Sequence, residues 1–243
     1  MICSRRCNGV SGMRILALEF SSALRSAAII QEGQVTGRAQ EEKPLTIGPI
    51  RLIRDVLGQA QMEPAGVTCV AVGLGPGSYT GVRVAIAMAQ GWELARGVKL
   101  LGMSSVECLA WQAWLEGHEG DVAVVVDAQR GECYVARYRV TQQTLAAVEP
   151  LKLETRAEVE RLEAGGCRLI GPDGGRLVPG LRTAFPEAGI LGVLAWERGG
   201  FVPGADLQPI YLRAVDFVRA SPPRVIPPRP PAGSRASPGE APT

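Results

Sequence analysis

The sequence runs twice through the same order of elements, and this repetition constrains the fold more than any single motif does. A strand over 14–19 leads through a tight turn into a second strand over 26–31. The second half has an apolar strand over 121–126, a turn beginning at Asp127, and a strand over 132–140. Hairpins give antiparallel neighbours and helical connections give parallel ones, so each half predicts a mixed sheet. We expect an α/β protein of two related halves.

The remaining elements follow from apolar periodicity and turn residues. In the first half we expect a strand over 34–40 after a Glu32-Gly33 turn, a helix over 46–62, a strand over 67–73, a helix over 81–97, a strand over 99–102 and a helix over 104–116. Ser104 and Glu107 predict a capping box for that last helix. The second half continues with a strand over 146–153, a helix over 156–164 and a strand over 168–170, and then has no clear element before residue 209.

The composition is that of a folded, soluble chain with peripheral ends. Of 243 residues, 46% are hydrophobic and 21% charged, which excludes a disordered chain. We expect an N-terminal extension over 1–12, a first domain over 13–103, a second and reduced domain over 104–218, and a disordered proline-rich tail over 219–243.

Charge and cysteine content argue against several classes of protein. The net charge is +2, but both ends are basic and residues 15–218 carry −4, which disfavours a large nucleic-acid surface. No apolar run is long enough to span a bilayer, and we expect a cytoplasmic protein. The six cysteines form no Cys-x-x-Cys pair and the chain has one histidine, so no metal site is predicted. We expect buried, reduced cysteines.

The glycine-rich segment over 73–81 is the most informative stretch for function. It joins a buried strand to a helix and reads Gly-Leu-Gly-Pro-Gly-Ser-Tyr-Thr-Gly. Such a loop can hold a phosphate or carboxylate on backbone N–H groups, with Ser78 and Thr80 adding hydroxyls. It can equally be a tight turn that caps the helix, and the residues leave both interpretations open. The segment lacks the Gly-Lys-Ser/Thr of a Walker A loop and the acidic partner of a Rossmann motif.

Other candidate catalytic groups are weaker. Glu19 and Asp127 end the first strand of each half, where a carboxylate can hold hydrated magnesium, but a turn carboxylate bonded to local backbone is favoured for both. Ser78 has no histidine near it in sequence, and His118 is interpreted as a solvated helix end. No His-Glu-x-x-His motif exists, so a metallopeptidase lacks its ligands. We predict no catalytic residue.

The helix over 82–95 is apolar nearly all round, interrupted only by Arg83, Gln90 and Glu93. A helix without a polar face is fully buried or contributes to an interface. Together with the helix over 46–62 it could form a surface for another subunit. The residues alone slightly favour burial within the chain.

Several motifs in the right order make the chain resemble the TsaB family, also called YeaZ, over about residues 13–216. The motifs are Arg14–Leu18, Gly75-Pro-Gly-Ser-Tyr-Thr-Gly-Val-Arg83, Ala89-Gln-Gly91, Gly102-Met-Ser-Ser105, Asp127-Ala-Gln-Arg-Gly-Glu-Cys-Tyr134 and Pro209-Ile-Tyr-Leu-Arg213. The resemblance implies the actin-like, Hsp70-like ATPase (ASKHA) fold, with two tandem RNase H-like domains.

The resemblance also implies a function. It implies a non-catalytic scaffold that binds TsaD, the catalytic paralogue, and works with TsaE, a P-loop ATPase, while TsaD transfers a threonylcarbamoyl group to adenosine 37 of tRNA. Contact with tRNA is expected mainly through the complex, and a homodimer is left open. Members of the family dock on TsaD through their first two helices. This resemblance favours an interface role for the apolar helix over 82–95. The interface candidates are Ile50, Ile53, Leu57, Val82, Ala85, Ile86, Ala89 and Trp92.

No cofactor is expected on the chain alone, and ATP or ADP with magnesium is left open at the partner interface. The nucleotide or anion candidates are Gly75, Gly77, Ser78, Thr80, Gly81 and Asp127. Glu19-Phe20 stands where the family usually has Asp-Thr, which disfavours phosphate binding at that turn. The alternative function is an independent ATP-dependent kinase or ATPase of the same fold.

Overall fold

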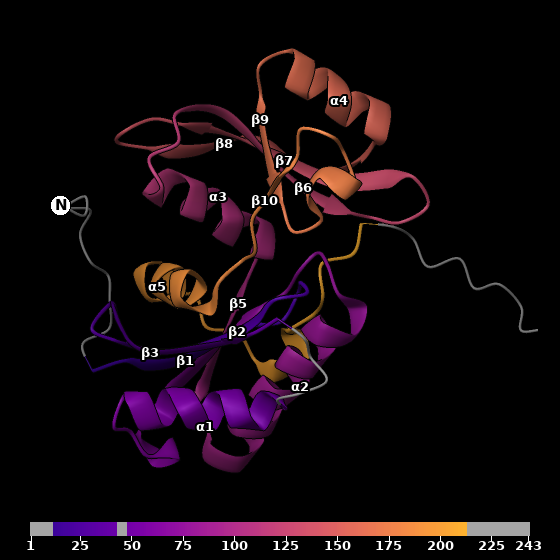
Figure 1. Ribbon diagram of the computed structural model, residues 1–243. Helices are drawn as coiled ribbons and strands as arrows, with labels where there is room; N and C mark the ends of the chain where they lie inside the picture. Colours follow the sequence, from indigo (N-terminus) through magenta and orange to yellow (C-terminus); the bar gives the residue numbers. More distant parts are fainter. Residues whose placement is uncertain (1–11, 43–47, 213–243) are drawn as a thin grey trace, which may run out of the picture. The chain divides into compact units, whose positions relative to one another are not determined.

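The computed structural model describes residues 12–42 and 48–212 and contains two five-stranded mixed sheets (Figure 1). The first sheet has the order β3-β2-β1-β4-β5. Its strands are β1 (Arg14–Glu19), β2 (Arg25–Gln31), β3 (Gln34–Glu41), β4 (Cys69–Gly73) and β5 (Lys99–Met103). β1 pairs antiparallel with β2 and parallel with β4, as the hairpin and the helical connection predict.

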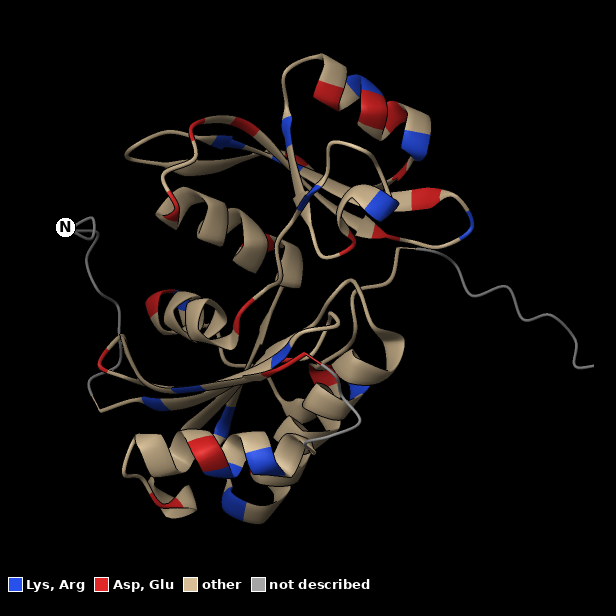
Figure 2. Cartoon of the chain, in the orientation of Figure 1, with Lys and Arg blue, Asp and Glu red and all other residues tan. Residues whose placement is uncertain are grey.

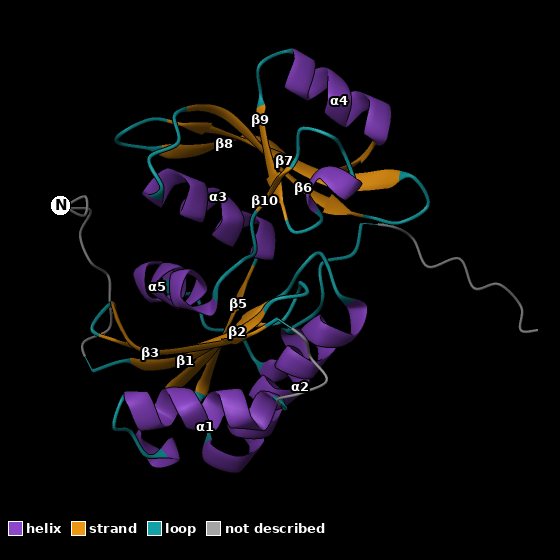
Figure 3. Cartoon of the chain, viewed as in Figure 1, coloured by secondary structure: helices purple, strands orange, loops and turns teal. Residues whose placement is uncertain are grey.

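Helices cover both faces of the first sheet because its central strands alternate their side chains between two cores (Figure 3). Leu16 and Leu18 pack against α1 (Pro49–Gln59) and α2 (Tyr79–Arg96). Ile15 and Ala17 pack on the opposite face against α5 (Ala188–Arg198). α5 follows the second sheet in sequence. The face of the first sheet opposite α1 and α2 is therefore covered by a helix near the end of the described chain.

The second sheet has the order β10-β9-β6-β7-β8, which repeats the order of the first. Its strands are β6 (Gly120–Asp127), β7 (Glu132–Val140), β8 (Leu145–Thr155), β9 (Arg168–Gly171) and β10 (Arg182–Thr183). α3 (Ser105–Leu115) packs on one face and α4 (Arg156–Ala164) on the other. The predicted α/β class with two mixed sheets is confirmed.

Two local predictions are wrong. Ser104 is the N-cap of α3, but its side chain makes no capping hydrogen bond; Glu107 instead pairs with Arg198 of α5, with 2.5 Å between Oε2 and Nη1. The capping box lies on α4, where Thr155 and Glu158 bond reciprocally. The sequence analysis also missed α5. This helix begins at Ala188, and its N-cap residue Glu187 makes no side-chain capping hydrogen bond, so the usual start signal is missing.

Some predictions concern residues at the limits of the described ranges. The 1–12 extension, the 219–243 tail, Cys3, Cys7 and the first residues of the predicted 46–62 helix lie outside them, apart from Gly12. Cys69, Cys108, Cys133 and Cys167 are buried free thiols, as expected. None of the helices in the described part of the chain has the length and hydropathy of a membrane span. The proposed boundary between residues 103 and 104 stays a prediction.

Candidate functional site

The glycines of the loop over 73–81 are needed because this loop packs directly on the β1–β2 turn. A Cβ at Gly77 would lie 2.1 Å from the carbonyl oxygen of Ser21, and one at Gly81 would lie 1.9 Å from that of Phe20. Gly77 also has a φ of +150°, which L side chains rarely adopt. The space that a phosphate cradle would offer beside these glycines is therefore filled by backbone of the same chain.

Ser78 caps α2 and is bound on both sides. Its N–H donates to the carbonyl oxygen of Ser21 at 2.6 Å, and its Oγ accepts from the N–H of Gly81 at 3.2 Å. Thr80, the second predicted hydroxyl, is exposed on the first turn of the helix. Of the two hydroxyls expected in an anion site, one is used by the helix cap and one faces solvent.

Glu19 is completely buried beneath the loop, and the sequence analysis did not predict this. Its Oε1 accepts from the N–H of Ser21 at 2.7 Å, and its Oε2 accepts from the hydroxyl of Ser105 at 2.8 Å. Burial raises the pKa of Glu19 above its ordinary value of 4.5. A Cβ at Gly73 would lie 2.0 Å from Oε2, so the strand that feeds the loop requires glycine beside this carboxylate.

Ser105 connects Glu19 to the glycine-rich loop. Its Oγ accepts from the N–H of Gly75 at 3.2 Å, and its own N–H donates to the carbonyl oxygen of Gly75 at 3.0 Å. The end of β1, the beginning of the loop and the first turn of α3 are thus joined by buried hydrogen bonds. The motif Gly102–Ser105 carried part of the family resemblance, but nothing local in it indicated this role.

The residues present do not form a nucleotide or magnesium site at the β1–β2 turn of this chain. Both oxygens of Glu19 are bound by groups of the chain, and Phe20 is fully buried. Gly77 and Gly81 are accounted for by backbone packing, and Gly73 by the adjacent Glu19 carboxylate.

Asp127 is also held by local backbone, as favoured from sequence. Its Oδ1 accepts from the N–H of Gln129 at 2.7 Å, and its own N–H donates to Oδ2 of Asp173 at 2.9 Å. Gln129 and Arg130 both have positive φ, 63° and 58°, so this turn is strained. A Cβ at Gly171 would lie 1.8 Å from the carbonyl oxygen of Val125, which is the same close approach seen in the first loop.

An aromatic stack with an arginine lies at the exposed start of α2. The rings of Tyr79 and Tyr211 have centroids 6.0 Å apart, and the guanidinium carbon of Arg83 lies 3.5 Å from the Tyr79 centroid. Arg83 also donates to the hydroxyl of Tyr211. The segment before Arg213 therefore contacts the Gly75–Arg83 motif. The two motifs are far apart in sequence, and nothing in either predicts their contact.

The predicted interface residues divide sharply by burial. Six of them lie in the core between the first sheet and its helices, with at most 7% exposure: Ile53, Leu57, Val82, Ala85, Ile86 and Ala89. Trp92 is half-buried and Ile50 is 71% exposed. These six interface candidates are buried within this chain, because in a helix that is apolar all round only packing selects the inner face. An interface on these helices stays a prediction.

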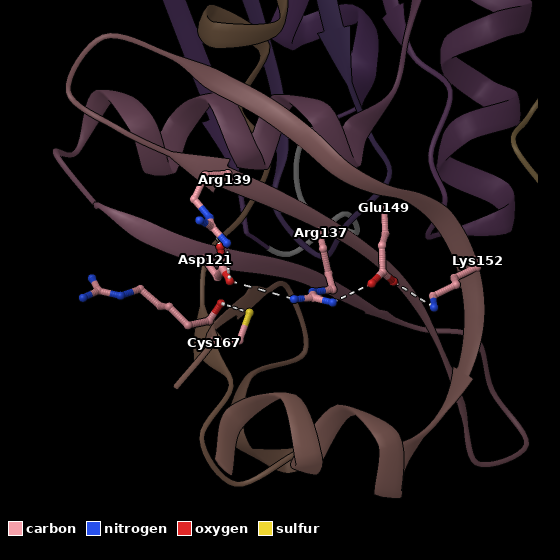
Figure 4. A network of polar contacts seen from close by, with 7 residues as sticks. Asp121, Arg137, Arg139, Glu149, Lys152 and Cys167 are labelled. Carbon is pink, nitrogen blue, oxygen red and sulfur yellow. Dashed lines mark hydrogen bonds and ion pairs between the residues drawn. The ribbon is translucent and has the colours of Figure 1, made fainter. Parts of the chain in front are cut away.

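Two clusters of charged residues elsewhere are engaged mainly by contacts within each cluster, although the Nε of Arg137 is buried without a hydrogen-bond partner. Arg137 of β7 lies between Asp121 and Glu149, and Arg139 and Lys152 extend the ion pairs across the second sheet (Figure 4). His118, interpreted as solvated, instead has only 12% of its side chain exposed. Its ring nitrogens lie 2.5 Å from Nη1 of Arg168 and 2.8 Å from Nη1 of Arg182. The described residues contain no group of three or more side chains arranged to hold a metal ion.

Comparison with known proteins identifies the family. The family model described as "TsaD: tRNA N6-adenosine threonylcarbamoyltransferase" matches residues 48–168. The chain is 32% identical over 225 residues to the tRNA threonylcarbamoyladenosine biosynthesis protein TsaB of Escherichia coli, which covers 83% of this chain and 95% of that protein. The Bacillus subtilis protein of the same name is 27% identical over 140 residues, covering 57% of this chain and 60% of that protein.

A solved structure agrees with these relatives. YeaZ from Pseudomonas aeruginosa superposes with a TM-score of 0.69 at 27% identity and covers 82% of this chain and 100% of that one. The repeated strand order and this superposition confirm the predicted actin-like arrangement of two mixed sheets. The chain therefore belongs to the TsaB (YeaZ) family of tRNA threonylcarbamoyladenosine biosynthesis proteins.

Proposed function

We propose that this protein is a non-catalytic scaffold or activator subunit. It binds a TsaD-like catalytic paralogue and supports threonylcarbamoyl transfer to adenosine 37 of tRNA. Membership in the TsaB family supports the pathway. The match of the TsaD model to residues 48–168 shows that α1 and α2 lie within the part of the chain that resembles the transferase.

The observation that carries the proposal is an uncharged stripe on the outer face of α2. Ala87, Gly91 and Leu94 are exposed at the spacing of one helix face, and Leu94 is 91% exposed. Ile50 of α1 adds a second large apolar side chain that is 71% exposed. Solvent and a partner can reach these side chains, so we infer that this stripe, and not the set of buried residues, is the expected interface.

The proposal assigns transfer chemistry to the partner. The whole chain contains one histidine, and its ring is engaged by Arg168 and Arg182. A TsaE-like ATPase and tRNA join through the complex, and ATP or ADP with magnesium would bind only at the interface with the paralogue. An independent kinase is disfavoured because the turn around Glu19 and Phe20 is closed by the chain itself.

The experiment is to mix the purified chain with the TsaD-like protein of the same organism and measure mass by light scattering after size exclusion. We expect a heterodimer that is lost or at least tenfold weaker in Ala87→Glu and Leu94→Glu, since a buried unpaired charge opposes association. Val148→Glu is the matched control, because Val148 is exposed by 48% on β8 of the second sheet. No complex with or without nucleotide, or equal loss in all three variants, would contradict the proposal.

A further inference from the structure

A pocket of about 660 Å³ opens at the end of the first sheet opposite the glycine-rich loop. It is lined by residues from the β2–β3 turn, the last turns of α3, the turn after β7 and helix α5. In the register of the first sheet, Gln31 beside this turn pairs with Arg14, whereas Glu19 lies at the other end of β1. The pocket is therefore separate from the glycine-rich loop and from the outer face of α2.

The walls of the pocket are mainly apolar and aromatic. Trp111 and Trp114 meet edge to face with ring centroids 5.0 Å apart, and Ile190 and Val193 of α5 line the pocket with them. The indole N–H of Trp114 donates to the carbonyl oxygen of Thr141 at 2.9 Å, which ties α3 to the β7–β8 turn. The volume lies within the range of small-molecule sites, roughly 300–1,000 Å³.

Both carboxylates that line this pocket lack a partner within the described ranges. Glu119 and Glu197 make no hydrogen bond or ion pair there, and burial raises the pKa of Glu197. The adjacent Arg198 is engaged by Glu107 at 2.5 Å. Figure 2 shows acidic positions at the end of α5 and just beyond α3. A positive group in the pocket would meet these two carboxylates, with the Arg198 guanidinium and the His118 ring also nearby.

We propose that this pocket, the Trp111/Trp114 pocket, binds a small organic cation that carries an apolar or aromatic group. The apolar group fills the space between α3 and α5, and the positive charge lies over an indole face and near Glu197. Tryptophan is the strongest aromatic partner of a cation, and a neighbouring carboxylate adds to the attraction. A bound ligand contacts both the β2–β3 turn of the first sheet and the β7–β8 turn of the second, so it would hold the two sheets together at this end.

The test uses tryptophan fluorescence of the full chain, titrated with benzyltrimethylammonium chloride as the probe. Benzyl alcohol and sodium benzoate serve as neutral and anionic aromatic controls. We expect saturable quenching by the cation, with affinity about tenfold above that for either control. Trp114→Leu should abolish most of the response. Trp92→Phe should keep it, because Trp92 lies on α2 away from the pocket.

A charge variant separates electrostatic recognition from simple burial of an aromatic ring. Glu197→Gln should weaken binding of the cation by about tenfold and leave benzyl alcohol unchanged. Glu160→Gln on the exposed side of α4 is the matched control and should bind as the parent chain does. Equal affinity for all three probes, non-saturating quenching, or unchanged binding in Glu197→Gln would overturn the proposal. Isothermal titration calorimetry of the parent and both glutamate variants gives the same comparison without relying on tryptophan.

Discussion

The hydroxyl of Ser105 donates to the buried carboxylate of Glu19 across 2.8 Å, and the same oxygen accepts from the N–H of Gly75. The hydroxyl of Ser105, at the start of α3, therefore bonds both the carboxylate at the end of β1 and an N–H of the glycine-rich loop. Ser105→Ala should lower the free energy of unfolding by about 2 kcal/mol, because it leaves two buried polar groups without a partner. Urea denaturation monitored by circular dichroism measures this.

Ser104→Ala is the control for that variant. Ser104 precedes Ser105 at the N-cap position but makes no side-chain capping bond, so its loss should cost less than about 0.5 kcal/mol. Equal destabilisation of both variants would show that Ser105 acts through helix formation and not through Glu19.

Glu19 should also impose a pH dependence on stability. Its pKa is raised by burial, so at pH values between 4.5 and that raised pKa the native chain keeps a proton that the unfolded chain releases. The contribution of Glu19 to stability is therefore fully present below pH 4.5 and is lost as the pH rises through the raised pKa. Glu19→Gln cannot ionise, so the stability of the parent chain relative to this variant should fall over that interval. Urea titrations of both proteins from pH 4.5 to neutrality test this, and parallel curves would refute it.

Two glycines of α2 should respond to alanine in opposite directions. A Cβ at Gly81 would lie 1.9 Å from the carbonyl oxygen of Phe20, so Gly81→Ala should destabilise the chain by about 2 kcal/mol. Nothing lies within 4 Å of a Cβ at Gly91, and alanine there should stabilise the helix by roughly 0.5–1 kcal/mol. Thermal unfolding of the two variants gives the comparison. A stabilising Gly81→Ala would mean that the loop does not rest on the turn.

Two alanines of the same helix distinguish core from surface. Ala85 is fully buried, so Ala85→Asp should cost about 3 kcal/mol or more and reduce soluble yield. Ala87 is exposed, and Ala87→Asp should cost less than about 1 kcal/mol, which reflects helix propensity alone. Denaturant midpoints of the isolated chain measure both. Comparable stability of the two variants would place Ala85 at a surface.

The strands could be predicted from sequence because their signals are local. Runs such as 121–126 and turns such as Glu32-Gly33 fix strand positions to within a few residues, and the repeated order fixes the sheet type. The inner face of α2 could not be predicted, since Ala85 and Ala87 are the same residue type with opposite burial. Glu107 was predicted to cap its helix, but it forms an ion pair with Arg198 instead. Arg198 lies 91 positions later in the sequence, and no local pattern indicates the contact.

The candidate site shows the same limit. The loop over 73–81 was recognised as the informative segment, but whether its glycines serve a ligand or a backbone contact depends on where the turn at Phe20 and Ser21 comes to lie. Glu19 was interpreted as a turn carboxylate, and one of its bonds, to the N–H of Ser21, is of that kind. Its second bond crosses 86 residues to Ser105 and is visible only in the folded chain.

Because α5 is synthesised after the second sheet, the first sheet cannot complete its core while its own strands leave the ribosome. When Asp127 has been synthesised, all five strands of the first sheet exist, yet the face formed by Ile15, Ala17 and their neighbours has no α5 to cover it. That apolar face can be covered by α5 only after the second sheet and Ala188–Arg198 have emerged from the ribosome. The nascent first half thus passes through an interval in which only α3 packs on this face, and the remaining apolar side chains are open to water, chaperones and neighbouring nascent chains.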